Sequence, residues 1–193
     1  MATTLEREIK LRFDDPEEAR AAVIAAGGTL LRGRRLQDDC LLDTADGFLR
    51  ERGSVLRVRQ ESGTSLLTFK GPVQPSVMKL REELETAVGD GTLMLRVLEE
   101  LGFRVWFRYQ KYREEFALEN TDVDVIIAID ETPVGTYVEI EGDERGIAMA
   151  TGALGREAAD YLLDSYRGLF VRHCQQHGLP ITNMIFAGER RPG

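Results

Sequence analysis

The chain has 193 residues, and 42% of them are hydrophobic, which is enough for the core of a folded domain. Its 33 acidic and 25 basic residues give a formal net charge of −8. Nonspecific binding to nucleic acid or to an anionic membrane is therefore excluded as the main activity, because both need a positive protein surface. A cleft lined by cations would still attract an anion that the net charge repels.

Cysteine usage and hydropathy give an expectation about the compartment. Cys40 and Cys174 have no metal-ligand spacing, so reduced thiols are expected rather than a disulfide framework. The first residues show no positive region followed by an apolar run, so no signal peptide is expected. No stretch reaches the roughly 18 apolar residues of a membrane span. We expect a cytoplasmic protein that has neither a membrane nor a nucleic acid as its partner.

Strand-like runs dominate the chain. The first covers residues 5–13, and the others cover residues 30–36, 37–42, 55–60, 66–70, 78–88, 103–110, 111–118, 123–130 and 135–141. No change in composition marks a linker, so one domain over residues 1–193 is expected, with residues 188–193 as a frayed tail. About eight strands with few long helices favour an α+β fold, an eight-stranded antiparallel β-barrel with helices packed outside.

Helices are predicted at three places between and after these strands. The first begins at Pro16, a residue suited to the first helical turn, and ends at Gly27. The second follows Asp90 and ends at Gly102, with apolar residues at helical spacing. After the last strand the pattern is helical again, and the longest helix is expected over residues 157–176.

Charged side chains recur at alternate positions on many of the predicted strands. In the stretch Glu6-Arg7-Glu8-Ile9-Lys10, period two places Glu6, Glu8 and Lys10 on one side of the strand. The same spacing occurs in Arg57 and Arg59, in Arg81, Glu83 and Glu85, in Lys111 and Arg113, and in Glu139 and Glu141. Either one sheet has a wholly solvated face, or a closed sheet points these charges into a shared interior. The second arrangement makes sense only if a charged ligand and a metal fill the interior.

The inferred interior mixes cations and carboxylates. The cations are Lys10, Arg57, Arg59, Lys70, Arg81, Lys111 and Arg113. The carboxylates are Glu6, Glu8, Glu83, Glu85, Asp130, Glu139 and Glu141. Several arginines together match a polyphosphate, and carboxylate clusters hold Mg²⁺ or Mn²⁺. A single pair is more simply interpreted as a salt bridge, but the whole set favours a site for phosphoryl or nucleotidyl transfer.

The order of short motifs resembles that of a known family. Glu6-Arg7-Glu8-Ile9-Lys10 matches the pattern ExExK of the CYTH family, whose members are also called triphosphate tunnel metalloenzymes. Further matches in family order are residues 37–43, Val55-Leu56-Arg57-Val58-Arg59, Leu67-Thr68-Phe69-Lys70-Gly71-Pro72, residues 81–85, residues 111–113, Asp130, Tyr137-Val138-Glu139-Ile140-Glu141 and Ser165-Tyr166. The resemblance covers nearly the whole chain, and it is the ordered set that makes it specific.

The resemblance implies an eight-stranded antiparallel tunnel that binds a triphosphate and a divalent metal, Mg²⁺ or Mn²⁺. Implied metal ligands are Glu6, Glu8, Glu139 and Glu141, with Glu83, Glu85 and Asp130 as further candidates. Implied phosphate-binding residues are Lys10, Arg57, Arg59, Lys70, Lys111 and Arg113, to which the charge pattern adds Arg81. Lys70, with Glu6 and Glu8, is the expected catalytic group.

One position departs from the family pattern. The tyrosine of Q-x-D-x-Y is Leu41 here. In thiamine triphosphatases that tyrosine is thought to help a lysine at the position of Lys70, so its loss speaks against thiamine triphosphate as substrate. Hydrolysis by a metal-positioned water is unaffected. Trp106 is interpreted as a packing residue, and His173 and His177 as residues that interact with the carbonyls at a helix end.

Metal-dependent hydrolysis of a triphosphate, either inorganic tripolyphosphate or an organic triphosphate, is the predicted function. One alternative is a class IV adenylate cyclase, which converts ATP into cyclic AMP and pyrophosphate. Another is a non-catalytic polyphosphate-binding module, against which the many carboxylates argue. The expected partner is a small molecule containing a triphosphate, and a homodimer is left open.

Overall fold

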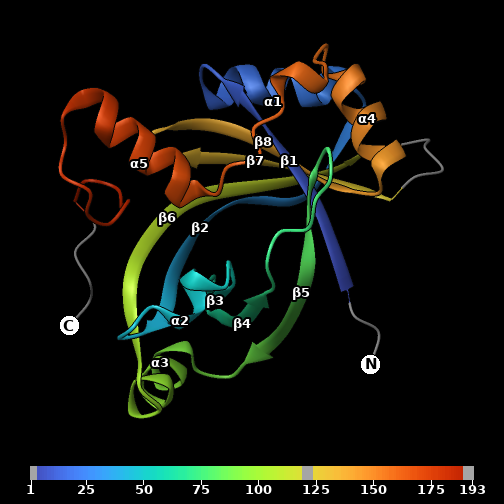
Figure 1. Cartoon of the computed structure of the whole chain (residues 1–193). Coiled ribbons are helices and arrows are strands. Elements are labelled where there is room, and N and C mark those ends of the chain that lie inside the picture. The colour runs from blue at the N-terminus through green and yellow to red at the C-terminus, as the bar shows by residue number, and fades with distance from the viewer. Residues whose placement is uncertain (1–3, 119–123, 189–193) are drawn as a thin grey trace.

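The computed structural model describes residues 4–118 and 124–188. Eight strands form a closed antiparallel barrel in the order β1-β5-β4-β3-β2-β6-β7-β8 (Figure 1). They are β1 (Thr4–Phe13), β2 (Gly28–Thr44), β3 (Val55–Glu61), β4 (Thr64–Lys70), β5 (Lys79–Val88), β6 (Phe103–Leu118), β7 (Val125–Thr132) and β8 (Gly135–Gly142). The predicted eight-stranded barrel is confirmed, whereas residue 123 of an expected strand and residues 189–193 of the expected tail lie outside the described residues.

Two strands are longer than the sequence pattern indicated. Residues 30–36 and 37–42 form the single strand β2, and residues 103–110 and 111–118 form the single strand β6. These two strands pair along their length, and the shifts in their register mark β-bulges. Bulges let a long strand bend without ending it, so the pair wraps around one side of the barrel.

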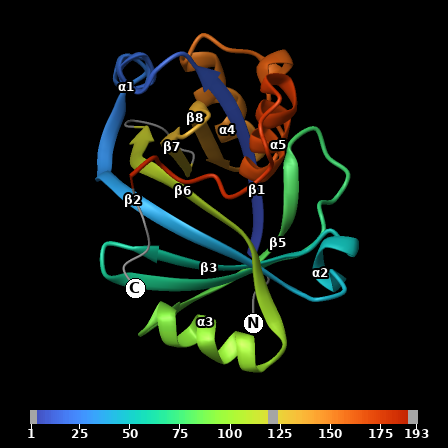
Figure 2. The same ribbon diagram turned by 90° about the vertical axis from the view of Figure 1, so that its left-hand side faces the viewer.

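Helices cover the barrel on opposite sides. Figures 1 and 2 show α1 (Pro16–Ala25) and α4 (Glu144–Ala153) together on one side and α3 (Gly91–Glu100) on the other. α1 and α4 pack on the outward apolar side chains of β1, β7 and β8, among them Ile9 and Ile140, whereas α3 packs on β3, β4 and β6 through Leu98. Because the apolar positions of these strands are taken by helices, the alternate charged positions face inward.

The predicted helix over residues 157–176 is wrong at its start. A 3₁₀ turn (Ala158–Asp160) comes first, and α5 begins only at Tyr166 and ends at His177. The backbone of Leu162 is extended instead, because its N–H and C=O bond to Lys10 O and N at 2.8 and 3.0 Å. Ser165 then caps α5 by accepting from Gly168 N at 3.1 Å. This detour brings the first turn of α5 to one end of the barrel, where Tyr166 packs against inward aromatic residues.

A short helix that the sequence pattern did not indicate, α2 (Phe48–Glu51), follows β2. Asp43 holds it in place, because its carboxylate accepts hydrogen bonds from the backbone N–H groups of Leu49 and Arg50 at 2.9 and 3.1 Å. In the described part of the chain, no helix is long and apolar enough to cross a membrane.

Candidate active site

The barrel encloses a cavity of about 700 Å³. Its lining contains nearly every side chain that the alternating pattern placed inside: Glu6, Glu8, Lys10, Arg57, Arg59, Lys70, Arg81, Glu83, Glu85, Lys111, Arg113, Glu139 and Glu141. They come from β1, β3, β4, β5, β6 and β8, so the structure brings together residues from most of the chain. Asp130 is the exception among the predicted site residues, because it is fully buried behind the lining.

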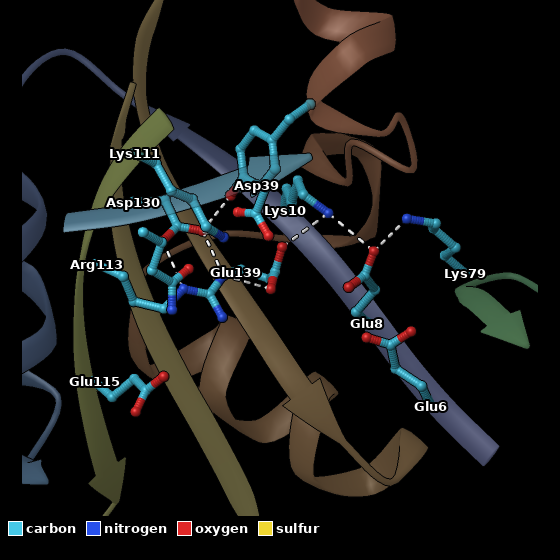
Figure 3. A network of polar contacts seen from close by, with 12 residues as sticks. Glu6, Glu8, Lys10, Asp39, Lys79, Lys111, Arg113, Glu115, Asp130 and Glu139 are labelled. Carbon is cyan, nitrogen blue, oxygen red and sulfur yellow. Dashed lines mark hydrogen bonds and ion pairs between the residues drawn. The ribbon is translucent and has the colours of Figure 1, made fainter. Parts of the chain in front are cut away.

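Asp130 holds the cations of one wall in place. Its carboxylate accepts hydrogen bonds from Lys111 Nζ at 2.8 Å and from Arg113 Nε at 2.7 Å (Figure 3). It also accepts one from the hydroxyl of Tyr166. Burial would raise the pKa of Asp130, but the two cations outweigh burial and hold it below its ordinary value. Burial and the neighbouring Arg113 lower the pKa of Lys111 to about 8. With its oxygens occupied in this way, Asp130 is placed to orient cations rather than to bind a metal.

Lys10 bridges two carboxylates in the middle of the cavity. Its Nζ lies 2.9 Å from Glu8 Oε1 and 3.0 Å from Glu139 Oε2, as Figure 3 shows. Glu8 also pairs with Lys79, a lining residue that the sequence analysis missed. Lys79 lies two positions before Arg81 on β5, so the same alternation would have indicated it. Burial and the nearby Lys10 lower the pKa of Lys79 to about 8.

Arg57 and Arg59 of β3 share the carboxylate of Asp39, for which the sequence pattern indicated no role. Asp39 Oδ1 lies 2.8 Å from Arg59 Nε and 3.4 Å from Arg57 Nε. Asp39 itself is fully buried, and it belongs to the quoted motif over residues 37–43. Arg57 Nε is buried and makes no hydrogen bond within the described chain. This arginine therefore has a donor left for a ligand.

Negative charge accumulates at one end of the tunnel. We call this region the carboxylate end, and define it by Glu6, Glu83 and Glu141. Lys70 pairs with Glu6 and lies 3.1 Å from Glu83, and Arg81 Nε lies 3.3 Å from Glu6. Burial and the neighbouring carboxylate Glu6 raise the pKa of Glu141 to about 7. The cations there do not offset all of the negative charge.

The comparison with protein families decides the classification. Residues 4–166 match the model of the CYTH domain. The chain belongs to the CYTH family. A relative from Methanocaldococcus jannaschii, named as a candidate adenylate cyclase, is 30% identical over 138 residues, which cover 71% of this chain and 76% of that protein.

Solved structures show the same CYTH fold. A candidate adenylate cyclase from Vibrio parahaemolyticus superposes with a TM-score of 0.72 at 20% identity, covering 88% of this chain and 99% of the other. A protein from Hippeastrum, described as a candidate adenylyl cyclase with a dominant triphosphatase activity, gives 0.62 at 21% identity, covering 91% and 97%. At these identities the likeness concerns the fold.

The carboxylate end suits the metal that the CYTH family implies. Its oxygen donors are of the kind that Mg²⁺ and Mn²⁺ prefer, and the raised pKa of Glu141 indicates negative charge that lacks a counter-ion. Burial and Glu8 likewise raise the pKa of Glu6. Among residues 4–118 and 124–188, no three acidic, histidine or cysteine side chains are already grouped as a metal site. A divalent ion would therefore draw these carboxylates together as it binds.

Leu41, which departs from the family pattern, and Trp106 both line the cavity. Leu41 takes the inward position of the family tyrosine on β2, where it packs with Phe107 and Tyr109. Trp106 packs against the same cluster, as its interpretation as a packing residue predicts, and its side chain is also part of the lining. It sits at the bulge where Phe107 pairs with Leu41 and Val105 pairs with Leu42, a local irregularity that alternation does not predict. His173 and His177 stack on each other in α5 and do not line the cavity.

Proposed function

We propose that this CYTH protein is a divalent-metal-dependent triphosphatase whose substrate lies along the tunnel. The observation that carries the proposal is the separation of charge within one cavity. Cations that are held by buried aspartates line its middle, and carboxylates in excess line one end. A triphosphate with a divalent ion supplies the two missing partners, an anion for the first region and a cation for the second.

The cations would bind the phosphate chain without large rearrangement. Arg113 is anchored by Asp130 and by Glu139 Oε1 at 2.6 Å, and Arg59 is anchored by Asp39. Anchored guanidinium groups lose little entropy when they bind phosphate oxygens, and they neutralise the charge that shifts during the transfer. The free donor of Arg57 points to the same role.

Glu6, Glu139 and Glu141, with Glu8 and Glu83, would hold Mg²⁺ or Mn²⁺. When bound, the metal supplies a Lewis acid and an activated water. Lys70 reaches the same region from β4, and its Nζ contacts both Glu6 and Glu83. In the proposed reaction a water oxygen attacks the terminal phosphorus, the bond to the bridging oxygen breaks, and tripolyphosphate gives orthophosphate and pyrophosphate. Lys70 stabilises negative charge on the reacting phosphate.

Cyclisation is the second candidate, and the name of the Methanocaldococcus jannaschii relative favours it. An adenylate cyclase would place the triphosphate similarly but would use the ribose hydroxyl of ATP as the nucleophile. The description of the Hippeastrum protein, with its dominant triphosphatase activity, favours hydrolysis. The Leu41 side chain offers no hydrogen bond at the family tyrosine position, which argues against thiamine triphosphate.

The test is an assay of three substrates. Purified protein with Mg²⁺ or with Mn²⁺ is incubated separately with tripolyphosphate, thiamine triphosphate and ATP, and orthophosphate and cyclic AMP are quantified. We expect orthophosphate from tripolyphosphate and none in EDTA. Cyclic AMP with stoichiometric pyrophosphate, and no orthophosphate from tripolyphosphate, would establish the cyclase instead. Tight binding of tripolyphosphate without any turnover would establish a binding module.

A further inference from the structure

The cavity has an opening between α2 and the start of α5 that the proposed reaction does not use. The lining there includes Arg50, Ser54, Trp106, Ser165 and Arg167. Arg50 and Ser165 are exposed, so the cavity reaches solvent at this point. We call this opening the arginine–tryptophan mouth, and define it by Arg50, Trp106 and Arg167. It lies where β3 begins and β2 ends.

Two guanidinium groups lie over the indole of Trp106. The Cζ atoms of Arg50 and Arg167 are 4.6 and 4.7 Å from the ring centroid. Both distances are within the range of a cation–π interaction, so the ring supports the two cations beside the opening. A cationic group on a substrate, such as a thiazolium, would be repelled there.

The positive charge of this mouth is only partly neutralised. Arg50 Nε lies 2.8 Å from Asp43 Oδ2, but that carboxylate also accepts backbone hydrogen bonds from α2. Arg167 has no carboxylate within ion-pair distance among the described residues, and its Nε is buried without a hydrogen-bond partner. Burial and the neighbouring Arg50 lower the pKa of Arg167, which shows that the two cations repel each other. An anion at this position would relieve the repulsion and satisfy the orphaned donor.

A phosphate chain in the tunnel would be led to this mouth. On β3 the inward row runs from Arg59 through Arg57 to Val55, and Val55 is the first residue of the strand, next to Ser54 in the mouth. Residues two apart on one face of a strand are roughly 7 Å apart, so the row forms a continuous path from the middle of the tunnel to the opening.

We propose that the arginine–tryptophan mouth is a further phosphate subsite, and that the protein binds inorganic polyphosphates longer than three phosphates. The inference rests on the proposed function, because it extends the same chain of phosphates by one position. Arg167 is the central contact, and Arg50 contributes the second cation. The added phosphate is an anion, which distinguishes this substrate class from triphosphates that carry a neutral or cationic organic group.

Calorimetry with tripolyphosphate and tetrapolyphosphate in EDTA tests the subsite, because no metal-dependent hydrolysis takes place under these conditions. In the wild type we expect tetrapolyphosphate to bind about tenfold more tightly, the effect of one charge-assisted contact. In Arg167→Gln the two dissociation constants should become similar. Arg167→Lys, which keeps the charge, should retain part of the preference.

Arg172→Gln is the matched control. It removes the same charge from the same helix, but Arg172 pairs with Asp164 at 2.7 Å and does not line the cavity. Thermal melting of each variant confirms that it is folded. A preference that survives in Arg167→Gln, falls equally in Arg172→Gln or is absent from the wild type overturns the subsite. If one of these outcomes occurs but the wild type still hydrolyses tripolyphosphate in the presence of the metal, only the subsite is wrong. If the wild type does not hydrolyse tripolyphosphate either, the proposed function is wrong as well.

Discussion

Two regions of the tunnel contain buried charges in opposite arrangements. One is the β6–β7 wall, formed by Lys111, Arg113 and Asp130, and the other is the carboxylate end. On the wall, Asp130 takes up the charge of Lys111 and Arg113, and Glu139 adds a second contact to Arg113. At the carboxylate end, carboxylates exceed cations, and the pKa of Glu141 is raised to about 7. Ion pairs within the protein therefore hold the cations of the wall before any ligand binds, whereas the carboxylate end has excess negative charge that the proposed metal would neutralise. The proposed binding of a triphosphate and a divalent ion in one cavity would use both conditions.

The largest effect should come from breaking the wall. Asp130→Asn leaves Lys111 and Arg113 without their shared counter-ion inside the barrel. Removing one partner of a buried ion pair typically costs about 3–5 kcal/mol, and we expect a loss of that order in the free energy of unfolding. Chemical denaturation followed by circular dichroism measures it.

The control for this variant is the neighbouring residue. Glu131 pairs with Arg34 at 2.8 Å on the outside of the barrel, where both side chains are partly exposed. Glu131→Gln should cost less than about 1 kcal/mol. Equal losses for the two variants would mean that Asp130 is not the anchor of the wall.

The second prediction concerns the binding of phosphate by Arg57. Arg57→Gln removes the buried Nε donor that makes no hydrogen bond in the described chain. Tripolyphosphate binding should weaken by about 2–5 kcal/mol, the range for losing one buried, charge-assisted contact. Monophosphate binding should change far less, because a single phosphate can settle on the remaining cations. Calorimetry with both ligands checks this, and equal losses would assign Arg57 a structural role.

Much of this site could be predicted from the sequence, because alternation is a local property. Glu6, Glu8 and Lys10 point inward for the same reason that Ile9 and Leu11 point outward, and the barrel brings such rows together. The division into strands was also close, although β2 and β6 had each been divided into two.

What the sequence did not reveal depends on contacts between distant segments. Asp130 was expected in the cavity, but Lys111, Arg113 and Tyr166 donate hydrogen bonds to it, and it lies behind the lining. Trp106 enters the cavity through a bulge, and α5 starts late because Leu162 bonds to Lys10. None of these features follows from a repeating pattern along the chain. The role of Arg167 follows from the late start of α5, so it could not be predicted either.

The third prediction removes carboxylates where they are in excess. In Glu6→Gln with Glu141→Gln, two donor charges are lost, and the affinity for Mn²⁺ should fall by at least about tenfold. The structure favours this pair over a variant of Glu8, because Glu8 neutralises Lys10 and Lys79 and its loss would leave buried cations unpaired. Titration calorimetry with Mn²⁺ and a denaturation curve for each protein separate metal binding from folding. Unchanged Mn²⁺ affinity would place the metal elsewhere.

The smallest expected effect is a dependence of stability on pH that arises at the carboxylate end. The pKa of Glu141 is raised from 4.5 to about 7, so the folded protein holds this proton more tightly than the unfolded chain does. The contribution of Glu141 is then most favourable below pH 4.5 and is lost as the pH rises to about 7. In EDTA, the melting temperature of the wild type should fall more between pH 5 and pH 8 than that of Glu141→Gln. A saturating concentration of Mn²⁺ should stabilise the wild type more at pH 8 than at pH 5, because the metal binds the deprotonated carboxylate. Identical pH profiles for wild type and variant in EDTA would show that the carboxylate end carries no strain, and that the contrast with the β6–β7 wall is not one of uncompensated charge.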